Sequence, residues 1–407
     1  MVRSPDNSQS SLPTPLGAVL AVTFFTSFST GVFWNGLSFI AKHAYDFDEK
    51  RNFILFAVMG GIYAVGAFRA AAMTRFAGRV CSPRQVLAFV IALQTVFCMM
   101  PVLFVGEWAL WTAAIGVTMA ASISWPLIES YISVGRHGQS MRSAIGWFNI
   151  TWTIAVCIPL LLMAPILEHH AKWAIGGLGV INLLGLIPLF LFTRQPGYHD
   201  AELSADHVQD EYPLLLRSAR VLLPLSYILM SAMTPILPYR LSEIGVEVAW
   251  ETPASATWMI VRVLALAIMW RLPFWHGRWG TLVLGAGAMT SGFGMVVLAP
   301  NIYIMLAGFV ICGIGMGVIY YAALYYGMAV GKAAIDAAGK HEALIGAGYG
   351  TGPLAGLVGT ALGGGAQIVA IVWGTMAIGI LPAILPYVRA RRLRKSNADS
   401  KDDIDPD

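Results

Sequence analysis

The stretch IYIMLAGFVICGIGMGVIYYAALYYGMAV, residues 302–330, contains no charged side chain and is long enough to cross a lipid bilayer as one helix. About 20 apolar residues in a helix span the roughly 30 Å hydrocarbon core of a membrane. Comparable apolar runs recur along almost the whole chain. Inside lipid only helices and closed barrels bond all of their backbone groups, and barrel strands would alternate in polarity over about ten residues. Because these runs are unbroken, we predict an all-α integral membrane protein.

The composition of the chain agrees with this prediction. Of its 407 residues, 57% are hydrophobic and only 12% are charged, whereas about a quarter of the residues in soluble proteins are charged. This composition argues strongly against a water-soluble fold. The apolar runs predict about twelve transmembrane helices, at residues 16–41, 53–73, 85–105, 108–134, 143–165, 171–193, 219–241, 254–270, 281–299, 302–330, 343–363 and 367–388.

The predicted spans fall into two groups of six. The segment 194–217 between the groups is polar and acidic, which is typical of a solvated connector. We therefore predict five parts: an N-terminal tail (1–15), a first six-helix bundle (16–193), a central loop (194–217), a second six-helix bundle (218–388) and a C-terminal tail (389–407).

Basic residues indicate how the chain is oriented in the membrane. If the N-terminus lies in the cytoplasm, most basic loop residues fall on one side, and the opposite loops keep only Lys42, Lys50, Arg51, Lys172 and Arg240. Cytoplasmic loops carry an excess of Lys and Arg in membrane proteins. We predict a multi-pass protein of the cytoplasmic (inner) membrane whose two tails and central loop are all cytoplasmic.

The two halves of the chain contain a weak internal repeat. Residues 134–136 (VGR), which close the fourth span, match residues 330–332 (VGK), which close the tenth. Ile-Gly at 145–146 in the fifth span matches Ile-Gly at 345–346 in the eleventh. Halves with the same membrane orientation imply a parallel repeat about an axis along the membrane normal. Two pseudo-symmetric bundles can then rock about a site between them.

Three local patterns make the chain similar to the major facilitator superfamily over residues 16–388. Residues 74–79 (TRFAGR) resemble the cytoplasmic Asp-Arg-x-Gly-Arg signature of that family, with Thr74 in place of the aspartate and one extra residue. Residues 271–280 occupy the corresponding loop of the second half. Residues 346–356, in the eleventh span, resemble the Gly-Pro-rich signature that proton antiporters of the family carry in their fifth helix. The resemblance implies alternating access around a central cavity. It also implies that Arg75, Arg79 and Arg278 form a cytoplasmic gate.

Two charged residues lie deep inside predicted spans, where an ionisable side chain is unfavourable and usually functional. Glu129 is a candidate for proton coupling, and Pro126 bends its helix. The alternative for Glu129 is a structural ion pair with Arg69 or with the basic loop after the second span. Arg262 is a candidate for binding a substrate carboxylate or phosphate, or for pairing with Glu129; the alternative is bonding to backbone carbonyls and polar neighbours. The eight histidines are predicted to lie in loops or at helix ends.

Polar and aromatic side chains gather on the spans that the resemblance places around the cavity. Aromatic rings with one polar tip suit a partly apolar solute, although packing and interface anchoring also explain many aromatic residues. Together with Arg262, the candidates for substrate binding are Trp34, Asn35, Asn149, Trp152, Tyr227, Tyr321, Tyr325 and Tyr349.

Several other functions lack their sequence signatures. The four cysteines form no CxxC pair, so we expect no metal site, and no cofactor is expected. There is no phosphate-binding loop, HExxH motif or nucleophile elbow, which argues against ATP-driven transport and against an enzyme. The small net charge of +4 gives no support for nucleic-acid binding. The expected partners are a small-molecule substrate and the lipid bilayer, and we expect the protein to act as a monomer.

The sequence therefore favours a secondary active transporter of a small solute that works by alternating access. Its preferred form is proton-coupled export of an amphiphilic compound. Two alternatives stay open. One is an uptake permease for a small organic anion or a sugar-like solute. The other is a sensor or assembly partner that keeps the fold but transports nothing.

Overall fold

A computed structural model describes residues 13–133, 135–136, 138–196, 211–330 and 335–402, and within these ranges all regular elements are helices. The first half contains α1 (Leu16–Gly31), η1 (Val32–Gly36), α2 (Leu37–Tyr45), α3 (Glu49–Ala77), α4 (Pro83–Leu103), α5 (Glu107–Ser133), α6 (Gly138–Leu162), α7 (Ala164–Leu184) and η2 (Ile187–Leu191). The second half contains α8 (Tyr212–Met233), α9 (Leu237–Glu243), α10 (Val248–Arg271), η4 (Pro273–Trp275), α11 (Trp279–Val297), α12 (Ile302–Val330), α13 (Ile335–Ala361) and α14 (Gly365–Asp402). The predicted all-α class is confirmed.

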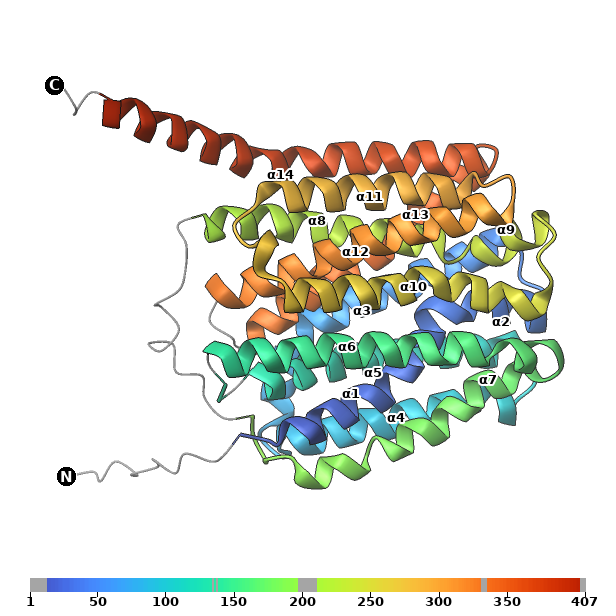
Figure 1. Ribbon diagram of the computed structural model, residues 1–407. Coiled ribbons are helices and arrows are strands. Elements are labelled where there is room, and N and C mark those ends of the chain that lie inside the picture. The colour runs from blue at the N-terminus through green and yellow to red at the C-terminus, as the bar shows by residue number, and fades with distance from the viewer. Residues whose placement is uncertain (1–12, 134, 137, 197–210, 331–334, 403–407) are drawn as a thin grey trace, which may run out of the picture.

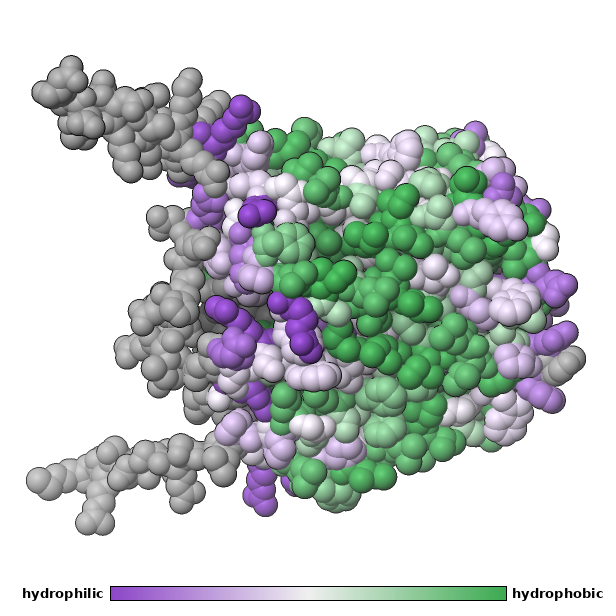
Figure 2. Space-filling model, in the orientation of Figure 1, coloured by the Kyte–Doolittle hydropathy of each residue, from purple (hydrophilic) through white to green (hydrophobic). Residues whose placement is uncertain are grey.

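The helices form a membrane-spanning body with an apolar exterior. In the described residues, 11 helical segments are long and apolar enough to cross a bilayer, with α1, η1 and α2 together forming the first. Glycine-rich α13 is less apolar, yet its 27 residues are long enough to cross as well. Figure 2 shows an apolar face lying between two ends where polar side chains gather. The protein is therefore a multi-pass membrane protein.

The helices pack as two bundles, α1 to α7 and α8 to α14, which lie one above the other in Figure 1. The start of α1 and the end of α14 lie at the same end of the molecule. We call this end the terminal end and the other the opposite end. Residues 1–12, 197–210 and 403–407 lie outside the described residues, so the predicted tails and central loop are described only in part. Val134, Gly331 and Lys332 of the sequence repeat lie outside them too.

The helix boundaries differ from the prediction most clearly at α13. The eleventh span was predicted to begin at residue 343, but α13 begins at Ile335. Glu342, near its start, is buried inside the protein, where a polar residue does not end a helix as it would against lipid. His341 and Glu342 therefore lie within the helix. Similarly, α8 begins at Tyr212, inside the predicted loop, with Pro213 in its first turn, where the missing N–H of proline is tolerated.

Glycines allow the two bundles to approach closely at two equivalent places. In α13, a Cβ on Gly346 would lie 2.5 Å from the Cα of Ala64 in α3. In α6, a Cβ on Gly146 would lie 2.2 Å from the indole ring of Trp270 in α10. These are the two glycines that the sequence repeat pairs, and each sits where one bundle packs on the other. The two contacts agree with the predicted pseudo-symmetry of the bundles.

Replacing Gly60 by alanine is expected to destabilise this interface, because a Cβ there would lie 2.3 Å from the backbone nitrogen of Gly350. Overpacking of this kind typically lowers stability by about 1–3 kcal/mol. The neighbouring Gly61 provides a matched control, since a Cβ there meets nothing within 4 Å. A thermal melt in detergent should show a lower midpoint for Gly60→Ala and no loss for Gly61→Ala. Equal melting of the two variants would contradict the close packing of α3 on α13.

Candidate functional site

The first transmembrane helix changes its hydrogen-bonding pattern at mid-membrane. Val32–Gly36 form a π-helical segment in which the backbone N–H of Leu37 bonds to the carbonyl of Val32. Such bulges occur frequently at functional sites. The segment carries Trp34 and Asn35, two of the predicted binding residues, and both are buried. The Asn35 side-chain nitrogen bonds to the Gly31 carbonyl at 3.3 Å, but in the described part of the chain nothing bonds to its Oδ1.

Aromatic rings from both bundles meet around Trp34. The ring of Tyr349 in α13 stacks on Trp34 with centroids 3.7 Å apart. Tyr63 of α3 contacts both rings edge to face, at 5.7 Å from Trp34 and 5.8 Å from Tyr349. Tyr227 of α8 contacts Tyr349 at 5.0 Å. This cluster connects the two bundles near the middle of the membrane.

Arg262 lies next to this cluster inside a cage of aromatic faces. Its guanidinium carbon lies 4.9 Å from the ring centre of Trp152 in α6, 4.8 Å from that of Tyr320 in α12 and 5.8 Å from that of Tyr227. A cation over an aromatic face is attracted by the ring quadrupole, more strongly when water is excluded. Arg262 is only 3% exposed. The rings therefore stabilise a charge that would otherwise be very unfavourable here.

The cage leaves hydrogen-bond donors without acceptors. Arg262 Nη2 donates to Tyr227 at 3.4 Å, while its Nε has no partner among the described residues, and none of their carboxylates forms an ion pair with it. Asn149 accepts a bond from Trp152 Nε1 at 3.1 Å, and within the same residues its own Nδ2 is unbonded. A buried donor without a partner is unfavourable by about 1–3 kcal/mol. Each of these donors could bond to an acceptor such as a carboxylate oxygen.

A pair of carboxyl groups joins the bundles nearer the terminal end. Glu129 of α5 and Glu342 of α13 are hydrogen-bonded to each other. Tyr63 donates to Glu342 Oε2 at 2.5 Å. A ring nitrogen of His341 and one oxygen of each carboxyl all lie within 4.8 Å of one another. The expectation that every histidine lies in a loop or at a helix end is therefore wrong for His341.

The carboxyl pair has a simple chemical consequence. A hydrogen bond between two carboxyl groups needs a proton, since two ionised carboxylates at this distance repel each other. The proton lies between α5 and α13, which belong to different bundles. Any motion that separates these helices breaks the bond and lets the proton exchange. Arg69, the other partner considered for Glu129, is exposed on α3.

The same three residues are potential metal ligands. To bind zinc, whose ligand atoms lie about 2.0–2.2 Å from the ion, the ring nitrogen and both carboxyl oxygens would have to converge on one point. Both carboxyls would also have to give up their mutual hydrogen bond. As arranged, the group fits a shared proton better than a metal ion.

Two further tyrosines from the predicted set lie away from Arg262. Tyr325 stacks on His276, with centroids 4.5 Å apart, and contacts Trp275 at 5.0 Å. Tyr321 also packs on Trp275, at 5.7 Å. The structure therefore does not bring Tyr321 and Tyr325 into the cage. Tyr320, one position earlier on α12, faces Arg262 in place of Tyr321.

The three arginines of the predicted cytoplasmic gate all lie toward the terminal end. Arg75, Arg79 and Arg278 have exposed side chains. The guanidinium of Arg79 lies 5.5 Å from the ring centre of Phe76. Their gating role stays a prediction.

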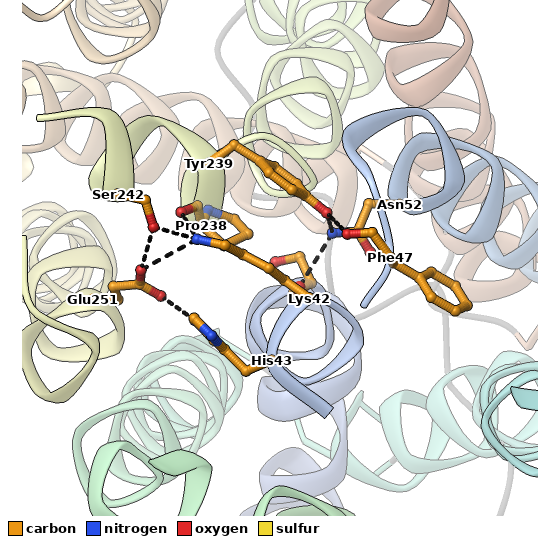
Figure 3. Close-up of polar contacts among 9 residues, drawn as sticks. Lys42, His43, Phe47, Asn52, Pro238, Tyr239, Ser242 and Glu251 are labelled. Carbon is orange, nitrogen blue, oxygen red and sulfur yellow. Dashed lines mark hydrogen bonds and ion pairs between the residues drawn. The ribbon is translucent and has the colours of Figure 1, made fainter. Parts of the chain in front are cut away.

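Polar side chains join the bundles at the opposite end as well, which sequence reasoning missed. Glu251, at the start of α10, is completely buried. Its Oε2 lies 2.7 Å from His43 Nε2, and its Oε1 lies 3.5 Å from Lys42 Nζ, so both basic residues at the end of α2 face it (Figure 3). Ser242 donates to Oε1 at 3.0 Å. Lys42 also donates to Ser242 and to the carbonyl of Pro238.

A second set of contacts lies beside this ion pair. Tyr239 of α9 donates to the carbonyl of Phe47 at 2.5 Å, and Asn52 of α3 donates to the Tyr239 hydroxyl at 2.9 Å (Figure 3). Burial raises the pKa of Tyr239 above its usual value, so the hydroxyl stays protonated and keeps donating. Together the two sets hold α2 and the start of α3 against α9 and α10. The two bundles are thus bonded together at the opposite end.

The geometry defines a membrane protein with the major facilitator fold. Solved structures similar to it include a POT family transporter in complex with a thioalcohol-conjugated peptide, with a TM-score of 0.71 and 12% sequence identity, covering 93% of this chain and 96% of that one. The human organic anion transporter MFSD10 has a TM-score of 0.63 at 12% identity, with coverage of 90% and 98%. The nucleoside transporter NupG has a TM-score of 0.63 at 12% identity, with coverage of 92% and 98%. No sequence profile of a known family and no curated protein sequence matches the chain.

Proposed function

We propose that the protein is a secondary active transporter that moves a small organic anion with an apolar body by alternating access, coupled to protons. The observation that carries the proposal is Arg262, a buried cation held by three aromatic rings and bonded to no carboxylate of the described chain. In most proteins a buried charge is paired. A charge held ready in an aromatic cage suits a partner that arrives and leaves.

The hydrogen-bond donors and the aromatic rings are proposed to bind different parts of the solute. Arg262 Nε and Asn149 Nδ2 bind its carboxylate, since both are buried donors that lack an acceptor. The faces of Trp34, Trp152 and Tyr349 contact its apolar body. One structurally similar protein is an organic anion transporter, which supports an anionic solute. The amphiphilic compound favoured by the sequence is thereby narrowed to an amphiphilic anion.

Proton coupling is assigned to the pair of Glu129 and Glu342. Because the two carboxyls come from different bundles, rocking of the bundles makes and breaks the bond that holds the proton. Proton exchange is then linked to the same motion that exposes Arg262 to one side or the other. Arg75, Arg79 and Arg278 are proposed to close the cytoplasmic end during this cycle.

The terminal end is proposed to face the cytoplasm, in line with the basic loop residues, so Lys42, His43 and Glu251 lie at the outer end. We propose export as the direction, because an aromatic cage suits amphiphilic compounds. Uptake of an organic anion would use the same residues. The flux experiment below distinguishes uptake from export. We expect the monomer to be the working unit, since both proposed sites lie within one chain.

The proposal is tested by finding a ligand and then measuring its flux. Purified protein is screened by thermal shift against small carboxylates and their amides, and a ligand at 100 times its Kd should stabilise the fold by about 2.7 kcal/mol. Compounds that stabilise it are then loaded into proteoliposomes with a pH gradient. We expect carboxylates to bind, amides not to bind, and the gradient to drive net flux. Binding without any flux would support the sensor alternative, and equal binding of the amides would contradict the proposed anion site.

A further inference from the structure

The carboxylate of Glu251 occupies a site built largely by the other bundle. Lys42 and His43, on the last turn of α2, approach its two oxygens, and Ser242 completes the contacts. Glu251 is 0% exposed, whereas the side chains of Lys42 and His43 keep 19% and 18% of their surface accessible. A charge so deeply buried is stable only while its partners stay in place. This site therefore already binds a carboxylate in the closed state of the outer end (Figure 3).

The helix that carries Glu251 also carries Arg262. The two residues lie about three turns apart on α10, which places them on the same face of the helix. Ser255, between them, is completely buried, and its Oγ has no hydrogen-bond partner within the described ranges. The hydroxyl of Thr252 is likewise buried and has no hydrogen-bond partner within these ranges. Buried hydroxyls without partners among the described residues thus lie along α10 near Glu251 and between Glu251 and Arg262.

The first transmembrane helix has a comparable row of polar groups. Ser38 lies one turn from Lys42 on α2, and its Oγ is buried without a partner in the described chain. Asn35 lies one turn further toward the middle of the membrane, with its Oδ1 also unbonded there. Its neighbour Trp34 stacks on Tyr349, which contacts Tyr227, the hydrogen-bond partner of Arg262. Both helices therefore offer polar groups from the outer site to the central cage.

We propose that Lys42 and His43 form an outer subsite for the anionic group of the solute, and that Glu251 occupies this subsite whenever the outer end is closed. The inference rests on the proposed function in two respects: the solute is an organic anion, and the end with Lys42 and Glu251 faces outward. When the outer end opens, α10 carries Glu251 away and leaves two basic side chains side by side on α2. A solute carboxylate has the same chemistry as the group that has just left.

The solute and Glu251 then exclude each other from one site. Closing of the outer end returns Glu251 to Lys42 and His43 and displaces the anion. The released anion leaves along the polar groups toward Arg262 or departs to the outside. Glu251 thus prevents the solute from being held permanently at the outer end.

This proposal differs from a simple latch in one measurable way. If the ion pair only held the bundles together, removing either partner would open the outer end and have the same effect on the binding of an anion from outside. If Lys42 is also part of the subsite, the two changes act in opposite directions. Glu251→Gln removes the carboxylate that competes with the solute and should tighten binding of the anion. Lys42→Gln removes the cation that binds the anion and should weaken its binding.

The experiment measures access to a cysteine placed at Ser38, which lies in the proposed passage. The native Cys81, Cys98, Cys157 and Cys312 are replaced by alanine, and a membrane-impermeant thiol reagent is added outside. Both Glu251→Gln and Lys42→Gln should speed the labelling of Cys at position 38. Arg51→Gln is the matched control, because Arg51 pairs with Glu107 at 3.0 Å within one bundle and both are well exposed. It should leave the labelling rate unchanged.

The probes are benzoate, phenylbutyrate and octanoate, each compared with its amide, as protectants of that cysteine. Glu251→Gln should lower the protecting concentration about tenfold and Lys42→Gln should raise it about tenfold, each equivalent to about 1.4 kcal/mol. The amides should not protect. Equal shifts in both variants, or no protection in any variant, would overturn the outer subsite. If protection fails while carboxylates still bind in the thermal-shift screen, only the subsite is wrong; if carboxylates fail in both assays, the proposed anion transport is wrong as well.

Discussion

Replacing Arg262 by lysine is expected to weaken binding of an anionic solute about 100-fold, a loss of about 2.7 kcal/mol. The flat guanidinium lies against three aromatic rings, and its Nε has no hydrogen-bond partner among the described residues. A lysine ammonium keeps the charge, but it is a compact, strongly hydrated group that cannot stack on a ring and also offer a planar pair of donors. The amide analogues should bind neither protein. Thermal-shift titration with matched carboxylates and amides measures both.

The same helix provides a control for this substitution. Arg271, at the terminal end of α10, lies 4.7 Å from the ring centre of Trp270, but its side chain is exposed. Arg271→Lys therefore makes the same chemical change at an arginine that also lies on an indole ring but is exposed. It should leave carboxylate binding unchanged. If Arg262→Lys kept the preference for carboxylates over amides, the cage would be a structural feature and the solute site would lie elsewhere.

The fold could be predicted from the sequence because its determinants are local. The run from Ile302 to Val330 has a single stable environment, the lipid bilayer, and the same holds for most other spans. The glycines at 146 and 346 also revealed the repeat, since close helix packing at both interfaces requires a small residue at that position. Hydropathy and the positions of small residues can be taken from the sequence without knowing which helices are in contact.

The partner of Glu129 could not be predicted from the same signals. Glu342 lies in a stretch of α13 whose polarity resembles a helix end in the sequence. Only the packing of α13 against α3, α5 and α8 places Glu342 in the interior. Glu251 was missed for the same reason, because a glutamate near a predicted loop gives no sign that α2 and α10 meet there. Contacts between bundles depend on the tertiary arrangement.

The rotation of each helix also limited the prediction of individual residues. Tyr320 and Tyr321 are adjacent in the sequence, but their side chains point about 100° apart around α12. Tyr320 contacts Arg262 and Tyr321 contacts Trp275. The π-helical segment around Trp34 adds a further local shift that periodicity cannot anticipate. The predicted set therefore identified the right helices more reliably than the right faces.

Replacing Glu342 by glutamine is expected to abolish uphill transport while leaving exchange intact. For coupling to one proton, a pH difference of one unit can drive about a tenfold solute gradient, because one pH unit corresponds to 1.36 kcal/mol. The wild-type protein should reach a gradient of this size in proteoliposomes whose membrane potential is clamped. In Glu342→Gln the amide still bonds to Tyr63 and Glu129, but it carries no exchangeable acidic proton. The solute ratio should then approach one, whereas counterflow without a pH gradient should continue.

Substitutions of Glu129 test whether the two carboxyls act as one pair. Because Glu129 and Glu342 share one hydrogen bond, Glu129→Gln should give the same loss, and the double variant should add little to either single change. Glu107→Gln, which removes an exposed carboxylate on the same helix as Glu129, should keep the full gradient. If Glu129→Gln and Glu342→Gln lowered the gradient independently and additively, each carboxyl would carry its own proton. If neither lowered it, the pair would only hold α5 against α13, and the proton would cross the membrane by another route.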